Sequence, residues 1–177
     1  MNGIIESAIA NCEMLIQEKP FMILSEGDFE RLLANCLDSC IKISLNDINY
    51  VVHTQISHYA NDGADSSVDA RVDILVMDER ERIKCEKHLK GYIYASASYA
   101  FELKYIHNGE SIEPVRKDFD KADKLLPQSE LYVMVLFDSY DLDHINSVKN
   151  MYEQKAKSIS HKSKLHYKVM FKRNEEI

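Results

Sequence analysis

Hydrophobic positions along the chain recur at helical spacing near the N-terminus and then at strand spacing. An amphipathic stripe predicts a helix over residues 3–18. Ser25 and Asp28 resemble an N-terminal capping box, so a second helix is expected to run from there to about Ser39. The first helix, residues 1–19, is an accessory element that must pack on the domain or on a second chain. A homodimer through this helix is therefore one possible assembly.

The middle of the chain is typical of strands. Period-two alternation predicts strands over Tyr50–Tyr59, Val68–Met77 and Tyr92–Tyr105. The breaker Asn61-Asp62-Gly63 between the first two predicts an antiparallel hairpin. The highly charged residues 78–90 are expected to form a loop or a strand extension.

Two further helices and two further strands are expected toward the C-terminus. Pro114 can begin a helix that ends near Leu126, and another helix is expected over residues 141–158. The apolar run within Glu130–Asp138 predicts a central strand covered on both faces, and His166–Phe171 could be a last strand. The predicted fold is α/β, a mixed central sheet flanked by helices, in one domain over residues 1–177.

Charged residues lie in two of the predicted strands. Glu102 and Lys104 project from one face of the third strand, and Asp73 interrupts the apolar run of the second. Burying charge is costly unless the charge is paired or bound to a metal. Asp73 and Glu102, with the Leu103 carbonyl, could hold Mg²⁺, and Lys104 could stabilise a metal-bound hydroxide or a phosphoryl oxygen. The alternative is a Glu–Lys pair at a sheet edge and an isolated Asp that closes a turn.

These residues resemble the signature of the PD-(D/E)xK nuclease superfamily, the fold of restriction endonucleases and Holliday-junction resolvases. The resemblance covers about residues 20–140. Asp73 matches the first acid of the family motif, and Glu102 and Lys104 match its E-x-K. Val72 stands where the motif has proline, a departure that the family tolerates.

The resemblance also extends to the neighbouring helices. Glu26 or Glu30 matches an acid on the first core helix, and Lys117–Lys121 resembles a D-x-x-K stretch on the helix after the E-x-K strand. The resemblance implies a restriction endonuclease-like αβββαβ core and hydrolysis of a nucleic-acid phosphodiester, DNA before RNA. It implies Mg²⁺, with Mn²⁺ as a substitute, and support of the metal by Glu26 or Glu30. Lys117 and Lys121 could contact phosphate or could pair with nearby acids.

The formal net charge of −7 does not indicate a nucleic-acid-binding protein, but the charge is unevenly distributed. Residues 155–173 contain seven Lys or Arg and no Asp or Glu, which makes Lys162 and Lys164 candidates for phosphate contacts. The segment could equally balance the charge of its own protein. An acidic body also suits a different function, in which an inactive nuclease-like fold binds a protein partner, as an immunity module does.

Several protein classes are not supported by the sequence. No apolar run approaches the roughly 20 residues of a membrane span, and no signal-peptide pattern is present. The motifs of zinc proteases, P-loop proteins, dinucleotide-binding proteins and serine hydrolases are absent. The four cysteines lack C-x-x-C spacing, which favours a reducing, cytoplasmic setting. We therefore expect a cytoplasmic protein that does not associate with membranes.

Overall fold

The computed structural model describes residues 1–44, 49–59, 69–84, 92–94, 99–124, 129–159 and 164–172. The helices are α1 (Asn2–Glu18), α2 (Glu26–Ser44), α3 (Glu113–Asp120) and α4 (Leu142–Ser158). The strands are β1 (Tyr50–Tyr59), β2 (Asp69–Asp78), β3 (Arg82–Lys84), β4 (Tyr92–Tyr94), β5 (Tyr99–Ile106), β6 (Glu130–Phe137) and β7 (Lys164–Phe171). Short 3-10 turns occupy Pro20–Met22, Glu79–Glu81 and Lys121–Lys124.

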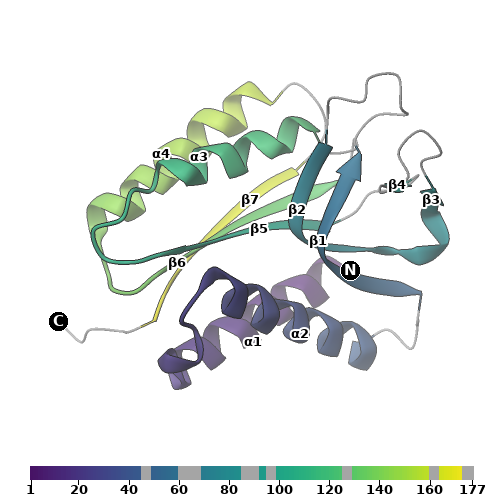
Figure 1. The fold of residues 1–177 in the computed structure, drawn as a ribbon, viewed down its shortest axis with the longest axis horizontal. Helices are drawn as coiled ribbons and strands as arrows, with labels where there is room; N and C mark the ends of the chain where they lie inside the picture. The colour runs from purple at the N-terminus through teal and green to yellow at the C-terminus, as the bar shows by residue number, and fades with distance from the viewer. Residues whose placement is uncertain are drawn as a thin grey trace.

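The strands form one sheet in the order β3-β4-β1-β2-β5-β6-β7, with helices on both faces (Figure 1). The α1 and α2 helices cover one face, and α3 and α4 cover the other. The sheet is mixed, because β1 and β2 are antiparallel whereas β5, β6 and β7 are parallel. The predicted α/β fold with a helix-flanked mixed sheet is confirmed. No helix in the described ranges is long and apolar enough to span a membrane.

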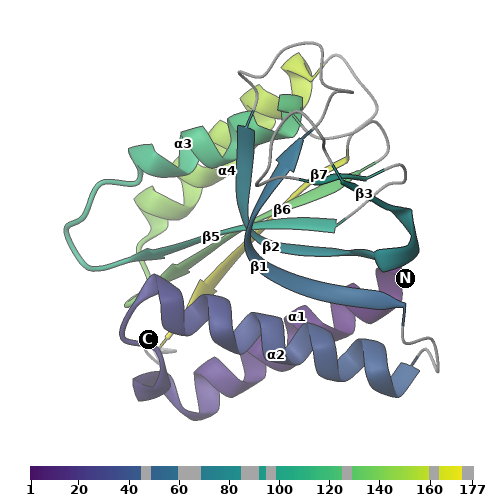
Figure 2. The same cartoon turned by 45° about the vertical axis from the view of Figure 1, so that its right-hand side comes forward.

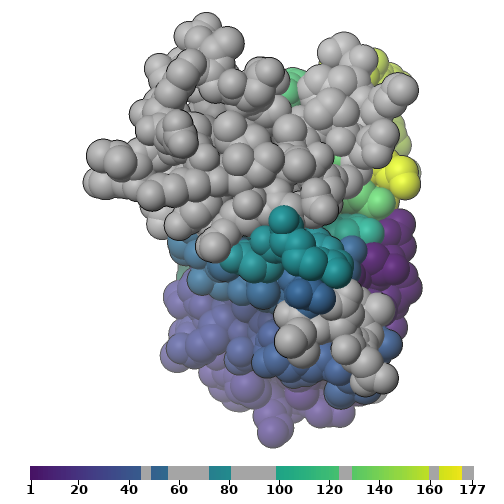
Figure 3. Space-filling view, turned by 90° about the vertical axis from the view of Figure 1, so that its right-hand side faces the viewer, coloured from purple at the N-terminus to yellow at the C-terminus, as the bar shows by residue number. Residues whose placement is uncertain are grey.

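The N-terminal helix packs within its own domain. Its apolar side chains Ile5, Ala8, Ile9, Cys12 and Ile16 are buried in the core that α2 and the sheet share. In the view of Figure 3, the purple and blue atoms of α1 and α2 form a layer below the teal atoms of β2. The apolar stripe is therefore covered by the same chain, and a homodimer through this helix stays a prediction.

The predicted start of α2 is confirmed. Ser25 Oγ accepts a hydrogen bond from the Asp28 backbone N–H at 3.2 Å, and Asp28 Oδ2 accepts one from the Leu24 N–H at 3.1 Å. The helix continues past the expected end at Ser39, because its apolar stripe extends to Ile41, which is 2% exposed.

The expected single strand over Tyr92–Tyr105 is wrong. Its two ends belong to different strands: β4 pairs with β3 and β1, whereas β5 pairs with β2 and β6. The β1–β2 hairpin lies between them, so one continuous strand could not reach both positions. The connecting residues 95–98 lie outside the described residues.

The C-terminal elements follow the prediction more closely. All residues of β6 are buried, as its apolar run indicated, and the structure also contains the expected α4 and β7. The α3 helix is shorter than expected, since it ends at Asp120 and continues as a 3-10 turn to Lys124. The expected end at Leu126 lies outside the described residues. Within the charged residues 78–90, residues 82–84 form β3.

The β1–β2 hairpin is strongly bent (Figure 2). Its ladder is interrupted at Gln55 and Asp73, and Gln55 has a φ of 53°, in the left-handed region. The β2 strand pairs with β5 at only three positions, the last of which is Ile74↔Phe101. Beyond that pair the two strands part. The resulting opening in the sheet at Asp73 and Glu102 is called the fork below.

The left-handed backbone at Gln55 leads to a stability prediction. Gln55→Gly and Gln55→Ala remove the same amide, but only glycine adopts a positive φ without a steric clash of Cβ. The Gly variant should therefore be more stable than the Ala variant by about 1 kcal/mol in urea unfolding. Equal free energies of unfolding would show that the left-handed conformation at this position carries no strain.

Candidate functional site

The fork places Asp73 beside the backbone of β5. Asp73 Oδ2 accepts a hydrogen bond from the Leu103 N–H at 2.8 Å, at the point where the ladder between β2 and β5 has ended. In an extended strand the N–H and C=O of one residue point to the same side. The Leu103 carbonyl therefore faces the fork as well. The Asp73 carboxylate and the Leu103 carbonyl thus face the same opening. Both are among the ligands that the sequence predicted for a metal site.

Glu102 contributes a buried carboxylate, with 1% of the residue exposed. Its Oε2 accepts a hydrogen bond from Lys121 Nζ at 2.5 Å. Its Oε1 is buried and has no hydrogen-bond partner among the described residues. Burial and the negative charge of Asp73 raise the pKa of Glu102 to about 8, against the opposing effect of Lys121. One oxygen of this carboxylate is therefore left without a compensating donor.

Lys104 projects from the same face of β5 as Glu102. Its Nζ donates hydrogen bonds to both carboxylate oxygens of Glu26, at 3.1 and 3.2 Å, and lies 3.9 Å from Asp118 Oδ2. Burial alone would lower the pKa of Lys104, but the charges of Asp118 and Glu26 outweigh it and raise the pKa above its ordinary value. Lys104 is thus held as an ammonium group that links α2 to α3 across the fork.

Asp118 is a residue of the site that the sequence did not single out as a ligand. It is 5% exposed, and its Oδ2 has no hydrogen-bond partner within the described part of the chain. Burial raises the pKa of Asp118 to about 6, although Lys104 and Lys121 oppose the shift. A signal was present in the sequence, because helical spacing places Asp118 in the same buried stripe as Val115 and Phe119.

The two acids of α2 that the sequence left as alternatives both reach the fork. Glu26 does so through Lys104, as described above. Glu30 Oε2 accepts a hydrogen bond from Gln55 Nε2 at 2.6 Å, and the same amide lies 3.3 Å from Asp73 Oδ1. Gln55 therefore joins an acid of α2 to the acid of β2. No sequence pattern distinguished Gln55, which is an exposed polar residue of a strand.

The fork contains an excess of acidic side chains. The acids outnumber the ammonium groups: Asp73, Glu102, Asp118, Glu26 and Glu30 against Lys104 and Lys121. As they lie, no three His, Cys, Asp or Glu side chains of the described ranges are grouped so as to hold a metal ion. Lys121 contacts one of the acids directly, and two buried carboxylate oxygens at the fork have no hydrogen-bond partner among the described residues. Carboxylate oxygens are the ligands that Mg²⁺ and Mn²⁺ prefer, and an oxygen that accepts no hydrogen bond is free to serve as one.

The lysines proposed for phosphate contacts do not gather at one place. Lys121 lies in the fork, where it is bound to Glu102. Lys117 is exposed on α3 and makes no ion pair with any described residue. Lys162 lies outside the described residues. Lys164 contacts Glu130 at 3.4 Å, at the start of the parallel strands and two strands away from β5.

The basic segment 155–173 largely pairs with acids of its own chain. The pairs are Lys155 with Asp120 and Asp123, Lys164 with Glu130, Lys168 with Glu13, and Lys172 with Asp138. The described part of this segment therefore balances charge within the protein. This was one of the two interpretations that the sequence left open.

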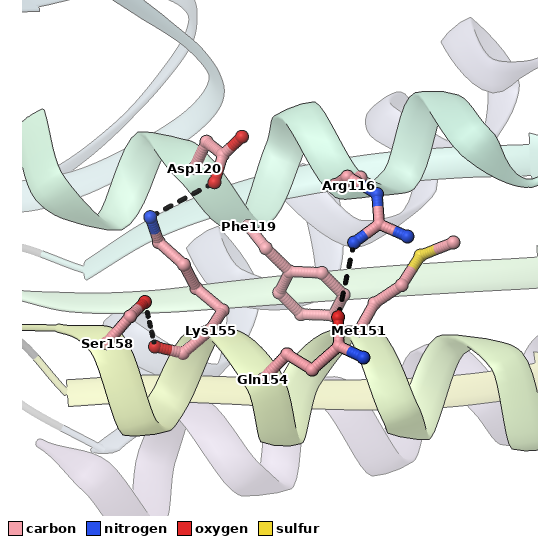
Figure 4. A pocket seen from close by; sticks show the side chains of 7 residues that line it. All are labelled: Arg116, Phe119, Asp120, Met151, Gln154, Lys155 and Ser158. Carbon is pink, nitrogen blue, oxygen red and sulfur yellow. Dashed lines mark hydrogen bonds and ion pairs between the residues drawn. The ribbon is translucent and has the colours of Figure 1, made fainter.

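A groove of about 180 Å³ lies between α3 and α4 (Figure 4). Its positively charged side chains also have partners. Lys155 Nζ forms an ion pair with Asp120 Oδ1 at 3.0 Å, and Arg116 Nη1 donates a hydrogen bond to Gln154 Oε1 at 3.4 Å. These side chains lie between the two helices, whereas Asp118 of α3 contacts the fork. The groove is therefore separate from the candidate site.

Comparisons with family models, with curated proteins and with solved structures found no match to this chain. The PD-(D/E)xK resemblance therefore stays a prediction that rests on the residues quoted for it.

Proposed function

We propose that this protein is a divalent-cation-dependent phosphodiesterase that hydrolyses nucleic acid, with DNA as the expected substrate. The observation that carries the proposal is the fork, where Asp73, Glu102 and Lys104 meet beside two buried carboxylate oxygens that have no hydrogen-bond partner among the described residues. The order of its elements supports a restriction endonuclease-like core: a helix with acids, a hairpin with Asp73, the strand with the E-x-K, a helix and a buried central strand.

The residues of the fork have different chemical roles in this proposal. Asp73, Glu102 and the Leu103 carbonyl would hold Mg²⁺ or Mn²⁺, with Asp118 close by. When bound, such a cation supplies a Lewis acid and a water molecule of lowered pKa. Lys104, oriented by its hydrogen bonds to Glu26, would position the attacking water or stabilise negative charge on a phosphoryl oxygen.

A cytoplasmic location is part of the proposal. Cys12, Cys36 and Cys40 are free thiols, and two of them are buried between helices rather than joined in a disulfide. Free thiols in the core support a reducing compartment.

Cation binding is the most direct test of the proposed site. Mn²⁺ should raise the unfolding temperature of the native protein progressively with concentration, because it binds only the folded state. Asp73→Asn should remove this effect, because the amide keeps an oxygen for the Leu103 N–H but lacks the charge. The matched control is Asp38→Asn on α2, an acid paired with Lys42 outside the fork.

Two further measurements complete this test. Crystals soaked in Mn²⁺ should give an anomalous peak at the fork, and Mg²⁺ should support cleavage of DNA that EDTA abolishes. Single-stranded and duplex substrates of DNA and RNA distinguish the substrate classes. A native protein that binds neither cation and cleaves none of these substrates contradicts the proposal.

A second candidate function is favoured by exposed apolar side chains between α1 and α2. Phe21 and Leu24 are 73% and 68% exposed, and exposed apolar residues within one short segment of an acidic protein suit a protein partner. In this alternative the nuclease-like fold is inactive and binds a protein, as an immunity module does. A folded native protein without cation binding would favour this candidate.

A further inference from the structure

Lys121 occupies the carboxylate that the proposed cation needs. Its Nζ lies 2.5 Å from Glu102 Oε2, and the Glu102 side chain is only 2% exposed. A Mg²⁺ ligand lies about 2.0–2.1 Å from the ion, so the ammonium group and the ion cannot share this oxygen. An ion on Glu102 Oε1 would still lie close to the ammonium group, and like charges in a buried site repel strongly.

Asp118 offers Lys121 a second acceptor on the same helical turn. The Oδ1 atom of Asp118 is 3.9 Å from Lys121 Nζ, and the two residues are three apart in sequence. The Asp118 Oδ2 atom is buried without a hydrogen-bond partner in the described part of the chain. The Lys121 side chain is 25% exposed, which leaves it room to rotate. The ammonium group can therefore pass from Glu102 to Asp118 without a change in the backbone.

The neighbouring charges would remain balanced after such a move. Lys104 lies between Glu26, at 3.1 Å, and Asp118, at 3.9 Å. Asp118 is thus only partly compensated by Lys104 at present. A buried charge that loses its partner is strongly destabilising. If a cation takes the place of Lys121 at Glu102 and Lys121 moves to Asp118, each buried acid has a positive partner.

We propose that Lys121 is a resident counter-ion of Glu102 that a divalent cation displaces onto Asp118. The inference rests on the proposed function, because it requires the cation site at the fork. In the metal-free protein Lys121 compensates the Glu102 carboxylate. In the presence of the cation it acts as a competitor, so it weakens cation binding and reduces occupancy when the metal is scarce.

The exchange leads to a clear expectation for Lys121→Met. Without the competing ammonium group, Mn²⁺ should bind about tenfold more tightly to the variant than to the native protein, as measured by isothermal titration calorimetry. Lys121→Gln, which keeps an N–H donor for Glu102, is the second variant if the Met variant does not fold. Lys117→Met is the matched control, because it removes the same charge from an exposed site one turn earlier on α3. Its Mn²⁺ affinity should stay within about twofold of the native value.

A double-mutant cycle tests where Lys121 goes. Asp118→Asn should weaken Mn²⁺ binding in the native background, because it removes both a nearby negative charge and the second acceptor for Lys121. In the Lys121→Met background only the first effect remains, so the loss should be at least about threefold smaller. A loss of equal size in both backgrounds overturns the transfer to Asp118.

The other outcomes separate this inference from the proposed function. Equal or weaker Mn²⁺ binding by Lys121→Met and Lys121→Gln overturns the exchange but leaves the metal site standing. Binding by neither native protein nor variants overturns the metal site, and the exchange with it. Binding by the variants alone overturns the displacement, because the resident lysine then excludes the cation and does not move to Asp118.

Discussion

Glu102→Gln and Lys104→Met are each expected to reduce cation-dependent cleavage by about a thousandfold or more. The first variant removes the charge that would hold the cation, and the second removes the ammonium group that would face the developing charge in the proposed reaction. Both side chains lie at the fork on one face of β5. Cleavage rates at saturating Mg²⁺, measured in single turnovers, are the appropriate readout because they exclude product release.

The chain offers matched controls for both variants. Glu130→Gln changes a second buried strand glutamate that contacts a lysine, and Lys168→Met changes a second strand lysine that is paired with a helix glutamate, Glu13, at 2.7 Å. Neither residue lies at the fork. Cleavage by the folded controls should remain near the native rate. If Glu102→Gln and Lys104→Met keep native activity, or if the controls lose as much, the fork residues are structural.

The metal-free protein is expected to lose stability as the pH rises from about 5 to 9, and Glu102→Gln should remove much of this loss. Burial raises the pKa of Glu102 to about 8 from 4.5, and that of Asp118 to about 6 from 3.8. The folded state therefore keeps protons that the unfolded state has already released. This contribution to stability is present below the unfolded pKa and is lost as the pH rises through the folded pKa. Glu102 alone accounts for a change on the order of 3–5 kcal/mol, at about 1.4 kcal/mol per pKa unit.

Urea unfolding in EDTA at several pH values measures this effect. Glu102→Gln should be more stable than the native protein at about pH 9, and the difference should vanish near pH 5. Saturating Mg²⁺ should stabilise the native protein at high pH but not the variant. Native stability that does not fall relative to Glu102→Gln over this range contradicts the raised pKa of Glu102.

The stability contributed by Glu130 should depend on pH in the opposite direction, and Glu130→Gln tests this. Burial opposes the ionisation of Glu130, but hydrogen bonds to His166 and Asn2 outweigh it and lower the pKa of Glu130. Its contribution to stability is therefore present above the unfolded pKa and is lost as the pH falls through the folded pKa. The variant should be less stable than the native protein at neutral and high pH. The two buried strand glutamates thus distinguish a carboxyl group whose pKa is raised by burial from one whose pKa is lowered by hydrogen bonds.

Much of the secondary structure could be predicted from local patterns. The α1 helix, the cap at Ser25, the β1–β2 hairpin and the buried β6 strand all follow the expectations closely. Each depends on the spacing of apolar residues within one segment, which the sequence displays directly. The split between β4 and β5 was missed because alternation continues across it, and strand pairing between distant residues is not a local property.

The candidate site was predictable only in part. Asp73, Glu102 and Lys104 stood out because charges in apolar strands are unusual. Asp118 belongs to the D-x-x-K stretch that the sequence showed, but it was not expected to be a ligand, because nearby exposed acids made it resemble a surface residue, although its helical position is in the buried stripe. The contribution of Gln55 depends on its left-handed backbone and on contacts to two other elements, which no local pattern encodes.

The sequence by itself determined the helices, most strands and the charged residues that interrupt the apolar runs, because the spacing of apolar and charged residues is visible within each segment. Only the tertiary structure decided that the hairpin bends at Gln55 and that β2 parts from β5 beyond Ile74↔Phe101. That separation opens the fork and lets acids of α2, β5 and α3 share two lysines. The compensation of a buried charge depends on which distant side chains can reach it, and this is set by the packing of whole elements.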